Sequence, residues 1–259
     1  MSESRRRGGL SRLSALGPAA WFACTITCSA MPDSAAAVEE IGNSYAALTA
    51  GYAEGDFGTS VKSELYSLTP EFGYVNDSYD LSASIPLQSL RTSGGGRSST
   101  ESGIGDAVLR AGRRLWRDPE GQVSFNGALL IKLATGDEDR GLGTGATDVG
   151  VQLSADRKVG AYSFIALAGY TQVGEPTGVS YDNVVSYGIG VNRSFVRTNV
   201  FASLQGQTSA VRGATSPLQV DLGFFRILSA DYVVIAHAFL GLSDGSPDGG
   251  VGLGIVRWF

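Results

Sequence analysis

The sequence feature that most constrains the fold is a period of two in the apolar residues, repeated along most of the chain. In the clearest segment, apolar residues alternate with small or polar ones: Val185, Tyr187, Ile189 and Val191 against Ser186, Gly188, Gly190 and Asn192. Such alternation indicates a β-strand with two different faces, because successive side chains of a strand point to opposite sides. Segments of this kind follow one another from residue 43 onward, and turn-forming clusters separate them.

Counting these segments predicts about twelve strands. The expected strands are residues 44–53, 60–74, 79–90, 105–116, 122–134, 147–158, 161–172, 183–194, 199–209, 217–228, 232–242 and 250–259. Short connections alternate with longer ones, which are expected at 92–104, 135–146, 173–182 and 243–249. An even number of strands, with tight turns at one rim and long loops at the other, is typical of outer-membrane β-barrels.

A soluble β-sandwich would also alternate, so the chemistry of the polar face must decide between the two architectures. In a sandwich that face meets bulk water and is usually charged. Here it carries mainly Gly, Ser, Asn and Gln, which suits an enclosed wet interior, and the 36 glycines of the chain favour curved sheets with tight turns. The sequence therefore predicts an all-β fold, a transmembrane antiparallel β-barrel of about 12 strands after an N-terminal signal peptide.

Residues 1–37 have the features of a signal peptide. A basic segment at Arg5–Arg7 precedes the weakly apolar Leu13–Ala30, and Ala35–Ala37 offers a cleavage site before Val38. A transmembrane helix is the alternative, but glycine, proline and hydroxyl residues interrupt the apolar stretch. We expect two parts, a signal peptide at 1–37 and an outer-membrane β-barrel at 38–259.

Composition excludes several functions for the expected mature chain. Both cysteines, Cys24 and Cys28, lie in the signal region, so disulfides, thiol catalysis and cysteine metal sites are excluded. Removing residues 1–37 takes away four Arg, one Glu and one Asp, which changes the formal charge from −5 to −7. An acidic chain without a basic patch is a poor candidate for binding nucleic acid.

The end of the chain predicts a contact with the outer-membrane assembly machinery. Val251, Leu253 and Ile255 alternate up to the terminal Phe259, a pattern that resembles the C-terminal strand signal of outer-membrane proteins. Arg257 departs from that pattern, because an apolar residue usually stands there. The expected contact is strand addition at an open sheet edge.

Two glycine-rich motifs carry a family resemblance. They are Lys132–Gly150, with its TGD, GLGTG and Asp148, and Gly103–Leu115, which reads GIGDAVLRAGRRL. Over Tyr45–Trp258 the chain resembles the outer-membrane family assigned to the phenol-degradation meta pathway, whose members are described as transporters. Ala134 stands where the family commonly has proline. The resemblance implies a small barrel that passes hydrophobic or aromatic solutes.

Other readings of these motifs are weaker. Gly141–Gly145 could be a phosphate-binding loop, but the following residues continue with a period of two, so the required helix is missing. The acidic residues of 137–139 and Asp148 could bind Ca²⁺, but Leu142 stands where an EF-hand loop needs glycine, and a solvated acidic loop is the simpler interpretation. His237, the only histidine, lacks the partners of a hydrolase base, since Phe239 stands where barrel phospholipases have serine. We therefore expect no catalytic residue, no metal and no cofactor.

Polar and charged residues in the polar phase of the strands are the candidates for lining a pore. They are Glu71, Asp80, Arg110, Arg114, Lys132, Asp148, Asn192, Asp221 and His237. Facing lipid would cost about 2–4 kcal/mol for each Arg or Lys near the midplane, so these residues should face the interior, where opposite charges can pair. They would form either a selectivity lining or a plug. Arg113 falls on the apolar face, where it is expected to extend to the periplasmic rim.

The strands at 161–172 and 232–242 are apolar in both phases, so the alternation does not assign which of their faces points inward. If His237 points inward, Phe239, Ile235 and Val233 point inward with it, and the phase of Phe201 and Phe225 is also inward. The interior would then be partly aromatic. Such a lining suits an apolar solute and suits a closed, packed interior equally well.

The leading functional hypothesis is a passive outer-membrane channel for small solutes, without enzymatic activity. The alternatives are a structural or adhesion barrel with a plugged lumen and, third, an outer-membrane lipid hydrolase. The expected partners are outer-membrane lipid and lipopolysaccharide, the assembly machinery and a small-molecule solute. Twelve strands lie between the number at which side chains fill a barrel and the number at which a channel is open, so strand count does not decide between a channel and a plugged barrel.

Overall fold

The regular structure of the chain consists of β-strands throughout the residues that the structure describes. The computed structural model describes residues 43–176 and 180–259, so the signal peptide expected at 1–37 lies outside them. The strands are β1 (Ser44–Gly55), β2 (Lys62–Val75), β3 (Tyr79–Ser84), β4 (Leu87–Gly94), β5 (Arg97–Ile104), β6 (Ala107–Arg117), β7 (Val123–Leu133), β8 (Asp148–Val159), β9 (Tyr162–Gln172), β10 (Val184–Ser194), β11 (Thr198–Gln207), β12 (Leu218–Ile227), β13 (Tyr232–Gly241) and β14 (Gly249–Trp258).

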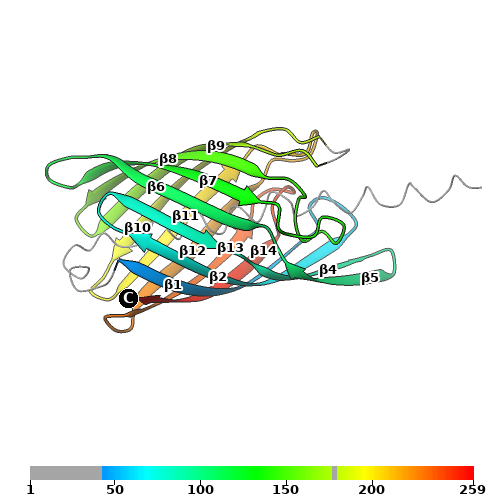
Figure 1. Ribbon diagram of the computed structural model, residues 1–259, viewed down its shortest axis with the longest axis horizontal. Helices are drawn as coiled ribbons and strands as arrows, with labels where there is room; N and C mark the ends of the chain where they lie inside the picture. Colours follow the sequence, from blue (N-terminus) through cyan, green and yellow to red (C-terminus); the bar gives the residue numbers. More distant parts are fainter. Residues whose placement is uncertain (1–42, 177–179) are drawn as a thin grey trace, which may run out of the picture.

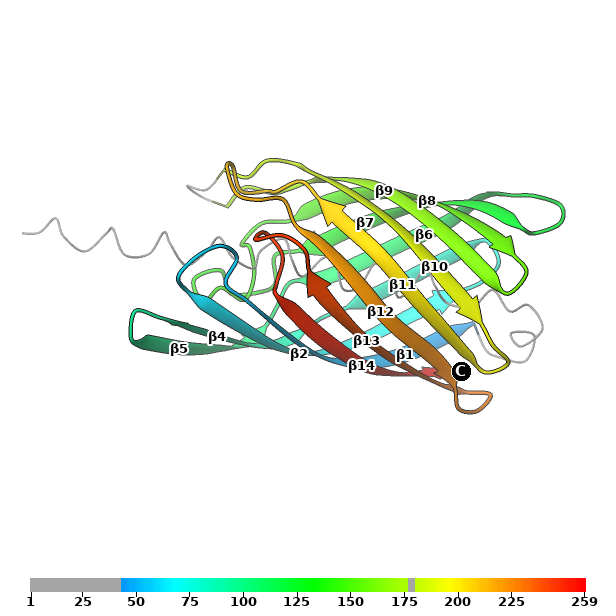
Figure 2. The ribbon, with the colours of Figure 1, turned by 180° about the vertical axis from the view of Figure 1, so that it is seen from behind.

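The strands close into an antiparallel barrel of twelve, because β1 pairs with both β2 and β14 (Figures 1 and 2). Both β3 and β4 pair with β2, so they are two halves of one strand interrupted at Ile85–Pro86. In the next strand, β5 and β6 are separated at Gly105–Asp106, and the Gly105 N–H donates to the Pro86 carbonyl at 2.8 Å. The predicted barrel of about twelve strands is confirmed.

One expected loop is wrong. Residues 92–104 form most of the hairpin β4–β5, which continues the wall beyond the barrel (Figure 1). Gly94 pairs with Arg97, so Gly95 and Gly96 make a two-residue turn with φ of 57° and 74°. Such a turn needs positive φ at both positions, which glycine adopts without strain, and it matches the twist of the strands. The longer connections expected at 135–146 and 243–249 are confirmed.

The two faces of the wall differ as the alternation predicts. Large apolar side chains on the outside are exposed around the whole barrel, for example Phe72, Leu153, Ile189 and Leu253. Polar and small residues alternate with them and are buried or half-buried on the inside. A closed barrel with an apolar outer surface fits the lipid bilayer, and the protein lies in the outer membrane. Within 43–176 and 180–259, no helix has the length and apolar character to cross a membrane.

The two rims also differ. The short turns and the C-terminus gather at one end, and the longer connections and the β4–β5 hairpin lie at the other (Figures 1 and 2). Outer-membrane barrels keep short turns on the periplasmic side, so we call these the periplasmic and extracellular ends.

Candidate functional site: the barrel interior

Every residue predicted to line the pore lies on the inner face of the wall. Among them, Lys132, Asp148, Asn192 and Asp221 are buried. The other five, Glu71, Asp80, Arg110, Arg114 and His237, are half-buried. Their inward placement fits the prediction, but they divide into three groups with different surroundings, at the extracellular mouth, the middle and the periplasmic half. Whether they line an open pore stays a prediction.

At the extracellular mouth, Lys132 is enclosed by two carboxylates. Its Nζ lies 3.1 Å from Asp106 Oδ2 and 3.0 Å from Asp148 Oδ2, and it also contacts the Thr144 hydroxyl. The side chains of Lys132, Asp106 and Asp148 are only 3%, 9% and 6% exposed. Sequence reasoning expected Lys132 and Asp148 along a pore. Their burial indicates instead that they hold the loops at the extracellular mouth in place.

The same carboxylates hold backbone from the loops. Asp106 Oδ1 accepts the Gly136 N–H at 2.9 Å, and its Oδ2 accepts the Thr144 N–H at 3.0 Å. Asp148 Oδ1 accepts the Gly174 N–H at 2.8 Å. The cluster therefore ties the strand break at Asp106 to two loops. Sequence reasoning missed Asp106, although it stands in the GIGDAV motif, because nothing local shows that it meets a loop some 30 residues later.

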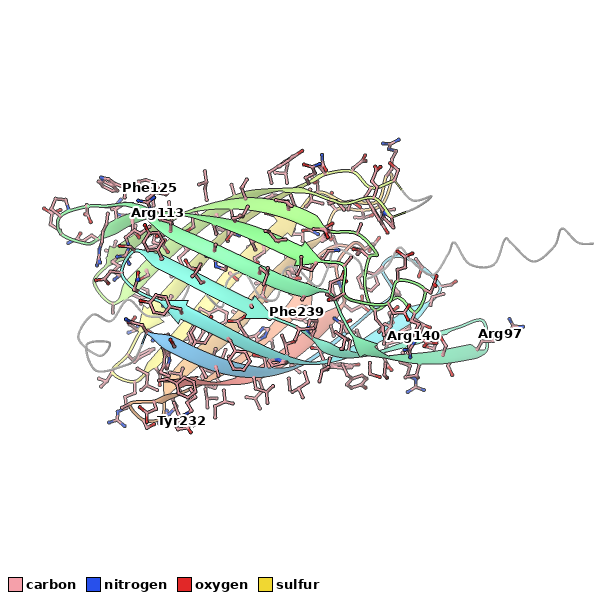
Figure 3. All side chains as sticks on the ribbon, in the orientation of Figure 1. Arg97, Arg113, Phe125, Arg140, Tyr232 and Phe239 are labelled. Atoms are coloured by element: carbon pink, nitrogen blue, oxygen red, sulfur yellow. The ribbon has the colours of Figure 1, made fainter. Side chains whose placement is uncertain are left out.

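The loop at 134–147 lies against the inner face of the β4–β5 hairpin. Leu142 is buried beside Gly103, and Arg140 Nε lies 2.9 Å from Glu101 Oε2. In the described part of the chain β5 pairs only with β4, and these side-chain contacts of the loop with Gly103 and Glu101 support β5 from outside that pairing. Figure 3 shows Arg140 at this loop and Arg97 at the tip of the hairpin.

Tyr181, in the loop between β9 and β10, belongs to the same end of the barrel. Burial raises the pKa of its hydroxyl, and the negative charges of Asp148 and Glu138 raise it further. The hydroxyl therefore stays protonated and neutral at neutral pH.

In the middle of the barrel, Asp221 is held by two amides. Its Oδ2 accepts from Gln205 Nε2 at 3.0 Å and from Gln219 Nε2 at 3.1 Å. His237, on the neighbouring strand, faces the same interior, and its ring lies over Gly252, where a Cβ would be 2.1 Å from Nε2. Glycine is therefore required at that place if the imidazole is to lie flat along the wall.

In the periplasmic half, one side of the interior is apolar. Tyr45, Phe201, Phe225, Ile235 and Val256 form its buried cluster. The rings of Phe201 and Phe225 lie 5.2 Å apart between centroids. The conditional expectation of a partly aromatic interior is confirmed, because Phe201, Phe225, Val233 and Ile235 lie inside as His237 does. The Phe239 ring also lies inside, over Gly250.

The other side of this half is polar. Arg110 Nε and Asp80 Oδ1 form an ion pair at 2.7 Å, which agrees with the expectation that opposite charges pair inside the barrel. Asn126 donates to Asp156 at 2.8 Å. The Tyr45 hydroxyl donates to Glu71 at 2.7 Å, where the apolar and the polar sides meet. The interior therefore offers an apolar wall and a hydrogen-bonding wall at the same depth.

Between these groups, part of the wall carries only small side chains. The inward residues Thr49, Ser67, Thr69, Gly169 and Thr171 are half-buried, so solvent reaches them although they face the interior. Small side chains therefore leave room inside the barrel at two separate parts of the wall, one at β1 and β2 and the other at β9.

The acidic and glycine-rich motifs have two further interpretations, as a metal site and as a phosphate-binding loop. Across 43–176 and 180–259, no three His, Cys, Asp or Glu side chains are grouped to hold a metal ion. Gly141–Gly145 belongs to the loop between β7 and β8, as expected, and β8 rather than a helix follows it.

Comparisons with known proteins agree with this architecture. The model of a family described as "Putative MetA-pathway of phenol degradation" matches residues 41–258. An outer membrane channel from Pseudomonas putida F1 is 14% identical with a TM-score of 0.68, over 85% of this chain and 96% of that chain. The KdgM porin is 7% identical with a TM-score of 0.53, over 82% of this chain and 99% of that chain. A comparison with curated proteins finds no match.

Proposed function

Because the chain belongs to the family described as "Putative MetA-pathway of phenol degradation", we propose that it is a passive outer-membrane channel for small solutes. The observation that carries the proposal is that small, solvent-accessible residues occupy the inner faces of β1 and β2, which we call the accessible strip, and again the inner face of β9 on a separate part of the wall. Large side chains could fill the interior of a barrel of this size, but part of the inner face here carries only small side chains. That a protein of similar fold is an outer membrane channel agrees with this function.

The chemistry of the interior favours solutes that are partly apolar. A hydrophobic or aromatic solute could lie against the half-buried apolar side chains that pack on the buried cluster, such as Ile165 and Val233, while its polar group meets the facing hydrogen-bonding wall. The proposed pore lining consists of the half-buried inward residues predicted from sequence, Glu71, Asp80, Arg110, Arg114 and His237, and the buried Asn192 and Asp221 lie in the wall behind this surface. No bound group is needed for diffusion, so the proposal includes neither cofactor nor catalysis.

Narrowing the accessible strip should reduce the current through a single refolded barrel. In Thr49→Trp an indole replaces a small inward side chain that faces the barrel interior, opposite Thr69 and Gly254 in the pairing. We expect the conductance to fall by about half or more, because the added volume enters the lumen. The measurement is single-channel recording in planar bilayers.

Ala50→Trp is the matched control, since Ala50 is the next residue and is exposed on the outer face. It should conduct like the unmodified barrel. Equal currents in all three proteins would contradict a path along this strip, and absence of current in the unmodified barrel would instead favour the plugged structural barrel.

We also propose that the outward residues of β14 form the assembly signal. Val251, Leu253, Ile255 and Phe259 are all exposed on the outer face. Deleting Phe259 should slow insertion of the barrel in cells, because the terminal apolar side chain is lost, and heat-modifiable migration on gels would measure the folded fraction. Normal insertion kinetics of the truncated chain would contradict the assignment.

A further inference from the structure

Four arginines occupy matching positions on the outer face near the periplasmic turns. They are Arg157 of β8, Arg193 of β10, Arg226 of β12 and Arg257 of β14, and together we call them the arginine girdle. All four side chains are exposed. Each stands two residues before an exposed apolar residue at the turn or at the C-terminus: Val159, Phe195, Leu228 and Phe259 respectively. The outer face of a membrane barrel is an unusual place for so regular a set of charges.

The strand register puts the girdle at one level of the membrane. Arg157 of β8 pairs with Phe164 of β9, and Phe164 pairs with Val191 of β10. Arg193 stands two residues after Val191, closer to the periplasmic turn. The same offset of two residues relates Arg226 to Arg193 and Arg257 to Arg226. A constant offset in one direction is the stagger of tilted barrel strands, so the four guanidinium groups lie at one depth along an arc from β8 to β14.

Aromatic rings, rather than carboxylates, hold two of these side chains. Arg193 lies 5.3 Å from the centroid of Tyr162 and 5.0 Å from that of Phe195. Arg257 lies 5.8 Å from the Tyr232 centroid and 4.9 Å from the Phe259 centroid. Stacking orients a guanidinium group and leaves its N–H donors at the edge free to bind an anion.

The position of Arg113 on β6 supports the same arrangement. It is exposed on the outer face and lies 5.4 Å from the centroid of Tyr79. Figure 3 shows Arg113 and Tyr232 at the same end of the barrel, near the short turns and the C-terminus. Among the ion pairs that the structure gives for its described residues, none includes Arg113 or a girdle arginine.

Unpaired cations at this level need an anion from the surroundings. A guanidinium group that faces acyl chains is unfavourable, but it can extend to the headgroups and bind a phosphate through two parallel N–H donors. We propose that the arginine girdle binds the phosphate groups of anionic phospholipids in the periplasmic leaflet, and that it fixes the depth of the barrel in the membrane. This role is independent of solute passage.

Lipid binding to the refolded mature barrel tests the proposal. Native mass spectrometry would count the phosphatidylglycerol and phosphatidylcholine molecules retained as each is titrated in mild detergent. The unmodified barrel should prefer phosphatidylglycerol by roughly fivefold or more, because each arginine near the headgroups adds attraction to anionic lipid. Replacing all four girdle arginines by Gln should weaken phosphatidylglycerol binding roughly tenfold and abolish the preference.

A matched variant controls for total charge. Arg91, Arg97, Arg140 and Arg212 lie at the extracellular end, and replacing these four by Gln removes the same charge. That variant should keep the lipid preference. A girdle variant with Lys at the four positions, checked for folding by circular dichroism, should retain part of it, because the charge remains but the planar fork is lost.

Any of four results would overturn the proposal, and three of them come from phosphatidylglycerol binding. These three are an unmodified barrel without preference for phosphatidylglycerol, a girdle variant that binds it as tightly as the unmodified barrel, and an extracellular control that loses binding equally. Girdle-dependent binding of lipid A in place of phosphatidylglycerol would also overturn it, because lipid A belongs to the opposite leaflet.

Discussion

Replacing Lys132 by Met is expected to lower the free energy of unfolding by about 3–5 kcal/mol, the usual loss when one partner of a buried charge cluster is removed. Asp106 and Asp148 would remain buried without the ammonium group that lies about 3 Å from each of them. Their bonds to the backbone at Gly136, Thr144 and Gly174 would weaken as well, so the loops at the mouth should loosen. Urea unfolding in lipid vesicles, followed by circular dichroism, measures the change.

Lys62→Met provides the matched lysine control. Lys62 also lies close to a carboxylate, 2.7 Å from Glu54, but its side chain is 48% exposed, and solvent screening should make the substitution nearly silent. A triple variant that adds Asp106→Asn and Asp148→Asn to Lys132→Met should recover part of the stability, because the unpaired charges are gone. If Lys132→Met lowers the free energy of unfolding no more than Lys62→Met does, the cluster does not hold the loops at the mouth.

Placing an arginine on the lipid face of β14 is the second large effect. Leu253→Arg should destabilise the barrel by about 2–4 kcal/mol, because Leu253 lies in the middle of its strand and a charge there meets acyl chains. The reversible unfolding assay in vesicles gives the value. The result would test which face of the wall meets lipid.

Ser67→Arg is the internal comparison for that substitution. Ser67 lies near the middle of β2 and faces the half-open interior, so its arginine can stay in water and the loss should be much smaller. Equal losses at the two positions would mean that both faces meet a similar environment. That outcome would contradict the assignment of an apolar exterior and a wet interior.

The strands could be predicted from sequence because each carries its own evidence. Alternation within β10 or β12 depends on neighbouring residues alone, and so does the assignment of Asp80, Asp221 and Arg110 to the inner face. That opposite charges pair inside the barrel also follows, since Asp80 and Arg110 lie on adjacent strands of the predicted order, but which charge meets which depends on the register.

The parts that could not be predicted depend on contacts between distant segments. Residues 92–104 are predicted as a loop because this Ser- and Thr-rich part of the β4–β5 hairpin lacks an apolar phase, and only the pairing of 87–94 with 97–104 makes it part of two strands. The enclosure of Lys132 depends on a strand break at Asp106 and on the fold of the following loop. The alternation within a strand predicts whether a side chain points inward or outward, but it does not predict which distant segment packs over that side chain.

The projecting hairpin also makes the orientation of the barrel observable. At Gly95 and Gly96 an added Cβ would meet no atom within 4 Å, so these two glycines have open space around them among the described residues. Such a tip tolerates inserted peptide. An epitope placed between these glycines would therefore be displayed on intact cells if this rim is at the cell surface, and antibody labelling of living bacteria could record the orientation without purifying the protein.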